Sequence, residues 1–241
     1  MAQQVLQVVP SFHEGLLGSG KCYSFMNFAS LTSFFTSPRN DTSSVSYFCD
    51  GALMAWAVRL LTGKRVQRVS FDYTSIAPSV FEYAAKNALP VYIVGAEQSE
   101  LDGFIDKIRV NHPELVVAGS QNGYFGEQDT AAVYADIVAS KAGVVVAGLG
   151  AGKQEEFLSG LHAYGYSGVS FSCGGFIRQE ATATKQYYPA MINKLGLRAF
   201  YRMYREPHTI RRYALDYPKN MFRLFTGTIV GSFKILFAEN I

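Results

Sequence analysis

Residues 143–156 read GVVVAGLGAGKQEE. The run of valines bounded by glycines predicts a strand buried on both faces, and the apolar residues that follow recur at helical spacing up to residue 164. The same alternation extends outward in both directions. We expect strands at 90–95, 114–119, 143–148 and 168–173, and helices at 99–109, 127–141 and 154–164. This order predicts an α/β fold with a mostly parallel sheet and helices on both faces.

The front third of the chain is less regular. A strand that ends at Cys49 is expected before a helix at 52–61, which Gly63 closes, and the polar residues 37–44 predict a loop. The chain has 241 residues, of which 49% are hydrophobic and 17% are charged. This is enough for one full-sized domain with an appendage, and it excludes a disordered polymer.

The charge of the chain is unevenly divided. Residues 1–184 hold 12 Lys and Arg against 16 Asp and Glu, a net charge of −4, whereas residues 185–241 hold 10 against 3, a net charge of +7. We therefore expect a ligand-binding domain over 1–190 and a basic amphipathic appendage over 191–241, which favours an anionic partner. Nucleic acid is not expected as that partner, because no RNA- or DNA-binding module is recognisable and the rest of the chain is acidic.

The cysteines and the apolar runs bear on the compartment. Cys22, Cys49 and Cys173 form no CxxC or Cys/His cluster, so neither a zinc site nor a disulfide framework is expected. The sequence shows no signal peptide and no run of 18 apolar residues. A reducing, cytoplasmic location is the expectation.

Glycines recur where the predicted strands end, in the segments 119–126, 148–152 and 174–175. Open parallel sheets bind ligands beyond the carboxyl ends of their strands, so several such ends favour a nucleotide-sized ligand. The alternative is that glycine merely ends strands, as in any α/β protein.

Two familiar nucleotide motifs do not fit the segment 147–154. Ala147 and Gln154 occupy the first-glycine and hydroxyl positions of a phosphate-binding loop, and Lys153 replaces the third glycine of a dinucleotide fingerprint. A helix N-terminus with free amides and a lysine remains, which suits an anion.

Taken together, the segments at the strand ends resemble one family. They are Asp50-Gly51, Gly123-Tyr124-Phe125, VAGLGAGKQE at 146–155, Gly174-Gly175 and GLRAFYRMYREPHTIRR at 196–212. In order and spacing they resemble the WecG/TagA/CpsF glycosyltransferases, family 26. The resemblance implies a Rossmann-like body with a C-terminal appendage that docks on an anionic membrane. It also implies inverting transfer of a sugar from a UDP-sugar to a polyprenyl-diphosphate-linked saccharide for surface polysaccharide, with no cofactor and no metal.

The resemblance assigns roles to particular residues. Asp50 is the expected base for the acceptor hydroxyl, although by position it could instead cap the helix at 52–61. Asp72 is the second candidate carboxylate. Residues expected to contact substrate are Asn27, with Ser24 beside it, and Gly51, Gly123, Tyr124, Phe125, Gly148, Gly150, Lys153, Gln154, Glu155, Gly174 and Gly175.

Each of these roles has a structural alternative. Tyr124 could stack on the base or the ribose, or could be a core aromatic. Lys153 could meet a phosphate or stand in solvent, and Glu155 suits the first turn of a helix whatever its other role. Gln154 is the better candidate for a ligand contact.

The tail carries the diphosphate or membrane contacts. Lys194, Arg198, Arg202 and Arg205 share one helical stripe, which is unfavourable unless an anion lies against it, and Glu206 before Pro207 ends that helix. Arg211 and Arg212 are assigned with them. A second amphipathic helix is expected at 221–236, either lying in the membrane interface or packed on the core.

Some positions depart from the family pattern. Arg178 stands where an acidic residue is usual, Tyr187 begins a changed Tyr-Tyr-Pro, Arg198 replaces a glutamate, and Phe71 replaces a glycine. The leading hypothesis is an enzyme peripheral on the inner face of the cell membrane. The alternative is a catalytically diverged member that binds a nucleotide sugar or a membrane as a partner protein. The oligomeric state, the sugar and the acceptor are left open.

Overall fold

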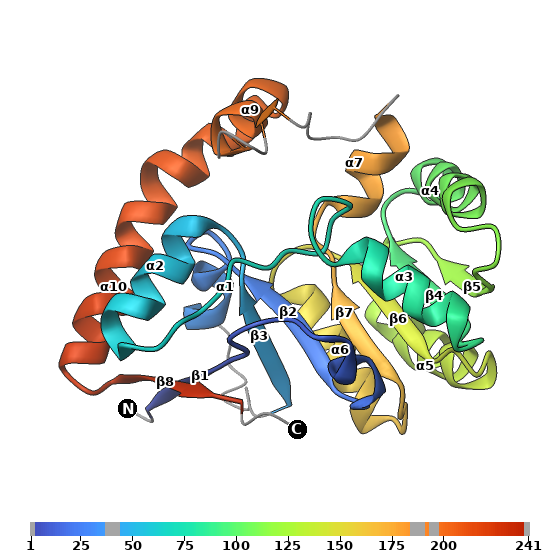
Figure 1. The fold of residues 1–241 in the computed structure, drawn as a ribbon, viewed down its shortest axis with the longest axis horizontal. Coiled ribbons are helices and arrows are strands. Elements are labelled where there is room, and N and C mark those ends of the chain that lie inside the picture. The colour runs from blue at the N-terminus through green and yellow to red at the C-terminus, as the bar shows by residue number, and fades with distance from the viewer. Residues whose placement is uncertain (1–2, 37–43, 184–190, 193–197, 239–241) are drawn as a thin grey trace.

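The fold is one sheet covered by helices. The computed structural model describes residues 3–36, 44–183, 191–192 and 198–238. In this part of the chain eight parallel strands form a single sheet in the order β5-β4-β6-β7-β2-β3-β1-β8 (Figure 1). The predicted α/β fold with a parallel sheet is confirmed.

The strands are short. Their bounds are β1 Gln4–Val8, β2 Cys22–Met26, β3 Val45–Cys49, β4 Val91–Gly95, β5 Val117–Gln121, β6 Val144–Gly148, β7 Val169–Ser172 and β8 Phe233–Phe237. The predicted strand at 114–119 is displaced, because β5 begins at Val117 and continues to Gln121.

The helices follow the strands in alternation. Their bounds are α1 Leu31–Thr36, α2 Ala52–Thr62, α3 Ala77–Lys86, α4 Gln98–Asn111, α5 Thr130–Ala139, α6 Lys153–Ala163, α7 Phe176–Thr182, α9 Arg198–Arg205 and α10 Tyr217–Ile229. Short turns of helix are η1 Glu14–Gly18, η2 Glu127–Asp129 and η3 Pro207–Thr209, and η4 Arg212–Asp216 is a π-helical segment. Gly63 closes α2 in the left-handed conformation, with φ 69°, as its position predicted.

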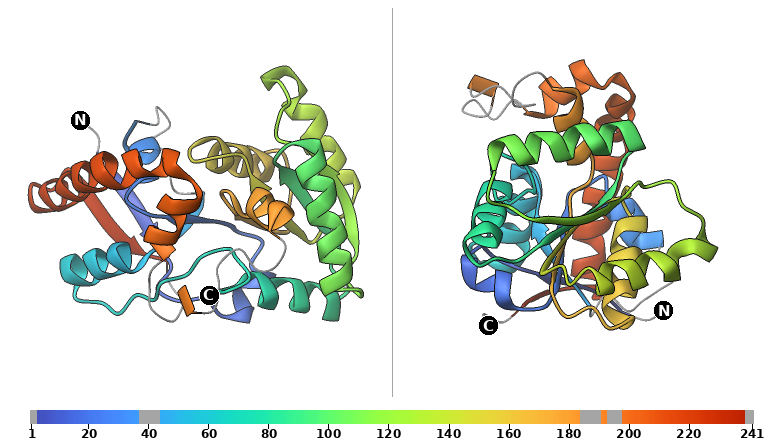
Figure 2. Two further views of the ribbon diagram at one scale, coloured as in Figure 1. Left: turned by 90° about the horizontal axis from the view of Figure 1, so that it is seen from above. Right: turned by 90° about the vertical axis from the view of Figure 1, so that its right-hand side faces the viewer.

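Two separate apolar cores show that helices cover both faces of the sheet. On one face α1, α2, α5, α6 and α10 pack on the strands, and on the other face η1, α3, α4 and α7 do so. Alternate residues of β6 divide between the two cores, Val145 on the first side and Val144 and Val146 on the second. The two further views in Figure 2 show the helices on the two sides of the sheet.

The prediction of one helix over 221–236 was wrong in its second half. α10 ends at Ile229, Gly231 turns the chain with φ 75°, and residues 233–237 form β8, which pairs in parallel with β1. The burial of Phe233 and the exposure of Lys234 follow the two-residue period of a strand. The apolar spacing of this stretch fits both periods, and pairing with β1 decides between them.

The C-terminal segment packs on the sheet. Asn220 of α10 is fully buried, and its Nδ2 donates to the Phe28 carbonyl and to Thr32 Oγ1, both at 2.7 Å. β8 adds the edge strand. The predicted boundary after residue 190 lies outside the described residues and stays a prediction. Among the described residues, no helix is both long and apolar enough to cross a membrane.

Candidate active site

Asp50 follows β3 at the carboxyl edge of the sheet. Its backbone N–H donates to the Met26 carbonyl at 2.9 Å, which carries the pairing of β2 and β3 one residue beyond β3. Asn27, directly after β2, points its Nδ2 at Asp50 Oδ2 at 3.4 Å. The resemblance had assigned these two residues to one site, and the parallel register places them side by side.

The alternative role of Asp50 as a helix cap does not match the geometry. Gly51 occupies the cap position of α2, with φ 94°, and no side chain bonds to the amides of the first turn. Asp50 is half-buried. Its carboxylate is therefore directed to the edge of the sheet and is not used to end the helix.

The surroundings of Asp50 raise its pKa. Burial is the main cause, Arg68 opposes it, the nearby Asp72 carboxylate adds to it, and Asn27 and Arg202 oppose it more weakly. As a result, the pKa of Asp50 lies above the ordinary value of 3.8. A carboxylate tuned in this direction is a stronger proton acceptor than a solvated aspartate, as a general base requires.

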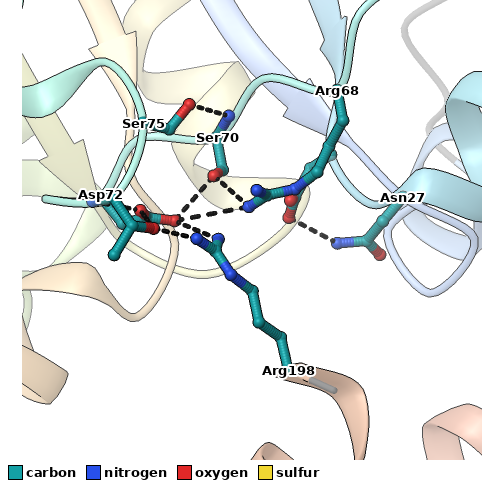
Figure 3. A network of polar contacts seen from close by, with 8 residues as sticks. Asn27, Arg68, Ser70, Asp72, Ser75 and Arg198 are labelled. Atoms are coloured by element: carbon teal, nitrogen blue, oxygen red, sulfur yellow. Dashed lines mark hydrogen bonds and ion pairs between the residues drawn. The ribbon is translucent and has the colours of Figure 1, made fainter. Parts of the chain in front are cut away.

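Arg68, Ser70 and Asp72 form a chain of polar contacts (Figure 3), and Arg68 and Asp72 lie close enough to Asp50 to affect its pKa. Arg68 Nη2 donates to Ser70 Oγ at 2.6 Å, and Ser70 Oγ donates to Asp72 Oδ2 at 2.7 Å. Arg68 also lies 3.7 Å from Asp72 Oδ2 as an ion pair. The segment is extended, and Arg68 pairs with Cys49 in an isolated parallel bridge, which fixes it beside the end of β3.

Asp72 joins this network to α9. Arg198 Nη1 lies 3.2 Å from Asp72 Oδ2, and Arg198 Nη2 donates to Thr74 Oγ1 (Figure 3). Thr74 donates its own N–H to Asp72 Oδ1 at 2.8 Å. Burial would raise the pKa of Asp72, but the hydrogen bonds from Ser70 and Thr74 and the Arg198 guanidinium outweigh it, so the pKa lies below its ordinary value. Asp72 is therefore a fixed anion and a weaker candidate for the base.

A second set of ion pairs holds the other end of α9. Glu206 lies 3.5 Å from Arg202 Nε and 3.7 Å from Arg178 Nη2, and it accepts a hydrogen bond from Gln179 Nε2 at 3.0 Å. Two residues of the predicted basic stripe, Arg198 and Arg202, thus pair with acidic residues of the protein itself. Arg178 and Arg198, two positions that depart from the family pattern, both pair with acidic residues of this chain.

Arg202 lies near Asp50 at the carboxyl edge of the sheet. A methyl group built on Gly175 would lie 3.8 Å from Arg202 Nη2, and Arg202 lowers the pKa of Asp50. Arg205, Arg211 and Arg212 are exposed. Of the five arginines assigned to diphosphate or membrane contacts, Arg198 and Arg202 lie at the site and the other three are exposed.

Tyr213 and Tyr217 also belong to this neighbourhood. Their rings lie 4.8 Å apart between centroids, and Tyr217 packs on Phe28 at 5.7 Å. Burial raises the pKa of both phenols, and the Asp50 carboxylate raises each further. Tyr213 lies in the π-helical segment η4, a kind of distortion that is frequent at functional sites.

The residues described so far follow β2 and β3 at the carboxyl edge of the sheet. The glycine-containing loops at 119–126 and 148–152 form the other half of this edge. Gly123 donates its N–H to the Ala96 carbonyl at 2.9 Å, and a methyl group there would meet Gly95 Cα at 3.2 Å. Tyr124 follows with 76% of its surface exposed, so it is not a core aromatic. Phe125 instead packs against the core, 5.8 Å from the Phe157 ring. Gly150 adopts φ 85° in the turn before α6.

The side chains of Gln154 and Glu155 brace this loop. Gln154 is 5% exposed, accepts the Gly174 N–H at 3.2 Å, and donates to Glu155 at 3.0 Å. Glu155 accepts the Gly152 N–H and the Ser24 hydroxyl, both at 2.6 Å. Their direct contact with substrate stays a prediction, whereas Lys153 is exposed at the first position of α6.

Sequence reasoning missed Arg68, Tyr213 and Tyr217. A signal for Arg68 existed, because Arg68, Ser70 and Asp72 alternate along an extended segment and therefore point to one side. Tyr187 and Lys194 lie outside the described residues. Within the part of the chain that the structure describes, no three His, Cys, Asp or Glu side chains are grouped so that they could hold a metal ion. All three cysteines are buried and unpaired.

Two comparisons with known proteins bear on the family of this chain. The model of the "Glycosyl transferase WecG/TagA/CpsF family" matches residues 22–232, which include both halves of the edge. The chain is 30% identical over 195 residues to the UDP-Gal:alpha-D-GlcNAc-diphosphoundecaprenol beta-1,4-galactosyltransferase of Shigella boydii, and the alignment covers 80% of this chain and 82% of that enzyme.

Proposed function

Because the chain belongs to the WecG/TagA/CpsF glycosyltransferase family, we propose that it moves a hexose from a UDP-sugar to a polyprenyl-diphosphate-linked saccharide with inversion at the anomeric carbon. Galactose and a GlcNAc-terminated acceptor are the first candidates, since the Shigella boydii relative uses them. The observation that carries the proposal is the carboxylate of Asp50 at the end of β3. It does not cap α2, its pKa is raised, and two arginines lie nearby.

The reaction is a single displacement. Asp50 accepts the proton of the acceptor hydroxyl while that oxygen attacks the anomeric carbon of the donor. The bond from this carbon to the β-phosphate oxygen of UDP breaks, and its electron pair leaves with UDP. Asn27, at 3.4 Å, orients the Asp50 carboxylate for this transfer.

Arginines neutralise the charge that develops on the departing diphosphate. Arg68 and Arg202 both act electrostatically on Asp50, so both lie close enough to serve an anion bound beside it. Their ion pairs with Asp72 and Glu206 hold the guanidinium groups in place before substrate arrives. This role for arginine in place of a metal ion is part of the proposal.

The donor nucleotide is assigned to the glycine half of the edge. Tyr124 is exposed there and offers a ring face for stacking on the base. The positive end of the α6 dipole suits a phosphate, and Lys153 stands at its first position.

The acceptor implies a place for the enzyme. A polyprenyl chain remains in the bilayer, so we assign the protein to the inner face of the cell membrane as a peripheral protein that is attracted to anionic lipids. The excess of Lys and Arg after residue 184 supports this assignment.

The non-enzymatic alternative is not favoured. It was motivated by departures from the family pattern, and two of these, Arg178 and Arg198, are explained by ion pairs with Glu206 and Asp72. The relative that matches four-fifths of the chain is an enzyme.

One assay tests the proposal. The purified chain is incubated with a panel of UDP-sugars and with synthetic GlcNAc on a short-chain lipid diphosphate that dissolves without a membrane. We expect mass spectrometry to show addition of one hexose, and NMR to show a β linkage when the donor is α-linked. Absence of product with every donor would refute the proposed function, and a retained anomeric configuration would refute the single displacement.

A further inference from the structure

α2 exposes large apolar side chains on the face that it turns away from the core. Leu53, Trp56 and Leu60 are 45%, 52% and 60% exposed, while Met54 and Val58 on the opposite face are buried. Residues three, four and seven apart lie on one side of a helix, so the three side chains form a single stripe. A helix face in contact with water would usually carry polar side chains at these positions.

α10 continues this apolar surface. α2 and α10 lie side by side at one end of the molecule (Figures 1 and 2), and the Trp56 ring lies 6.4 Å from that of Phe225. Phe222 and Ile229, one turn to either side of Phe225, are 71% and 79% exposed. We call the exposed side chains of Leu53, Trp56, Leu60, Phe222 and Ile229 the α2–α10 face.

Exposed cations lie on the chain segments that carry this face. Residues 51–71 and 217–238 together contain seven Lys and Arg and no Asp or Glu, and Asp50, Asp72, Asp216 and Glu239 stand directly outside them. Arg59, Arg65 and Lys219 are exposed. An apolar stripe with exposed cations beside it is the pattern of a helix that lies in the interface of an anionic bilayer.

The charge also argues against a second copy of the chain as the occupant. A two-fold contact would bring the exposed Arg59, Arg65 and Lys219 of both copies together, with no carboxylate in either segment to offset them. Phosphatidylglycerol and similar lipids supply the negative charge that the face lacks, together with acyl chains for Trp56 and Leu60.

The position of α2 connects the face to the reaction. α2 begins immediately after Asp50 and Gly51, and Leu53 follows Asp50 by three residues along the chain. A saccharide joined to a polyprenyl chain by a diphosphate lies at headgroup depth. Docking on this face therefore places the base near that depth.

We infer that the α2–α10 face, and not the arginine stripe of α9, is the surface that seats the protein on an anionic bilayer, with Trp56 inserted at the interface. The inference rests on the proposed function for the identity of the acceptor, but the contact with lipid stands on the face itself. Arg198 and Arg202 of α9 are engaged by Asp72 and Glu206.

Trp56 is the only tryptophan of the chain, so it reports on its own insertion. Its fluorescence is recorded with vesicles of phosphatidylcholine alone and of phosphatidylcholine with phosphatidylglycerol. We expect a blue shift with the anionic vesicles, and quenching by lipids brominated on their acyl chains. An unshifted emission under sedimenting conditions would overturn the inference, because the protein would then bind lipid through another surface.

Two pairs of variants test the energetics by co-sedimentation with the anionic vesicles. Leu53→Gln/Leu60→Gln is compared with Val110→Gln/Val116→Gln, which changes two exposed valines elsewhere. Arg65→Gln/Lys219→Gln is compared with Lys21→Gln/Lys86→Gln, which removes the same charge from other exposed positions. We expect about a tenfold loss of vesicle affinity in the first member of each pair and little change in the second. Equal losses within both pairs would contradict the inference.

The enzyme assay separates this inference from the proposed function. With the dissolved short-chain acceptor, the Leu53→Gln/Leu60→Gln variant should retain wild-type activity, which also shows that it folds. With the acceptor embedded in anionic vesicles, it should lose about the same factor as it loses in binding. If the wild-type protein were inactive on both acceptors, the proposed function would be refuted. The fluorescence of Trp56 would still show whether the α2–α10 face contacts lipid. Concentration-dependent burial of Trp56 without vesicles would indicate self-association and overturn the assignment to lipid.

Discussion

The two halves of the carboxyl edge are built by different means. Beyond β2 and β3, charged side chains hold one another, since Asp72 alone accepts hydrogen bonds from Ser70, Thr74 and Arg198. Beyond β4 and β6, the backbone shapes the edge at glycines that leave no room for a side chain. A methyl group on Gly95 would lie 2.5 Å from the Gly148 carbonyl oxygen, and one on Gly148 would lie 2.8 Å from that of Gly174.

The difference indicates how the work of a group transfer is divided. The charged half must hold a base and cations in fixed protonation states, so it is sensitive to pH and to loss of charge. The glycine half must leave room for a nucleotide, so we expect its function to be sensitive to added side-chain atoms and insensitive to pH. Substitutions in the two halves should therefore fail in distinguishable ways.

The largest effect is expected in the charged half from Asp50→Asn. An amide cannot accept the hydroxyl proton, so kcat should fall by about 10³-fold while the KM for the UDP-sugar changes little. Steady-state kinetics with the dissolved acceptor measures this, and Asp106→Asn on the exposed side of α4 is the control. A variant that keeps more than a tenth of the activity would remove Asp50 from the role of base.

In the glycine half, Gly148→Ala should lower the free energy of unfolding by about 3 kcal/mol, because the added methyl meets backbone at Gly174 and the Cys173 sulfur at 3.0 Å. The loss should be the same at every pH. Urea denaturation at several pH values checks it, with Gly165→Ala as a variant in which strain from φ 114° acts without any clash. A loss of unfolding free energy that depends on pH would contradict the proposed difference between the two halves.

Asp72→Asn should cost about 2 kcal/mol of stability at neutral pH, since it weakens charge-assisted hydrogen bonds and the ion pair with Arg198. The pKa of Asp72 is lowered in the folded protein, so its contribution is present above the unfolded-state pKa and disappears as pH falls through the folded-state pKa. The difference between wild type and variant should shrink in acid. A constant difference would show that Asp72 acts by packing alone.

Arg68→Gln should lower kcat/KM by about tenfold and shift its pH dependence. Arg68 lowers the pKa of Asp50, so its removal should move the acidic limb of the pH–rate profile to higher pH. Arg109→Gln, on exposed α4, should leave the limb unchanged. An acidic limb that moves to lower pH in Arg68→Gln would contradict the assigned electrostatics.

The smallest effect is expected from Tyr124→Ala, which should raise the KM for the UDP-sugar about fivefold through loss of roughly 1 kcal/mol of stacking. Tyr124→Phe should retain the wild-type KM, because the ring remains. Calorimetric titration with UDP checks both variants. If Phe were as poor as Ala, the hydroxyl and not the ring face would make the contact.

The sequence predicted those parts of the fold that local pattern determines. β4 and β6 were found because short runs rich in Val and Ile, bounded by Pro or Gly, predict buried strands, and Asp50 was found because a motif marks it. β8 was assigned to a helix because the choice depends on β1, which lies more than 220 residues away at Gln4 paired with Phe233. The Arg198–Asp72 pair spans 126 residues and leaves no local signal. The same separation hid Asp72 as the anion that offsets Arg198, whereas Glu206 lies only four residues beyond Arg202.

The pairing of β1 with β8 has a consequence for biosynthesis. β1 precedes β8 by more than 220 residues, so the side of β1 that pairs with β8 stays unpaired until residues 233–237 have been synthesised. A chain that stops before residue 233 keeps this open edge, which invites pairing with other chains, whereas a chain that includes β8 covers it and exposes Lys234 on the new edge strand. α10 leads directly into β8, so the position of the α2–α10 face also depends on this late pairing.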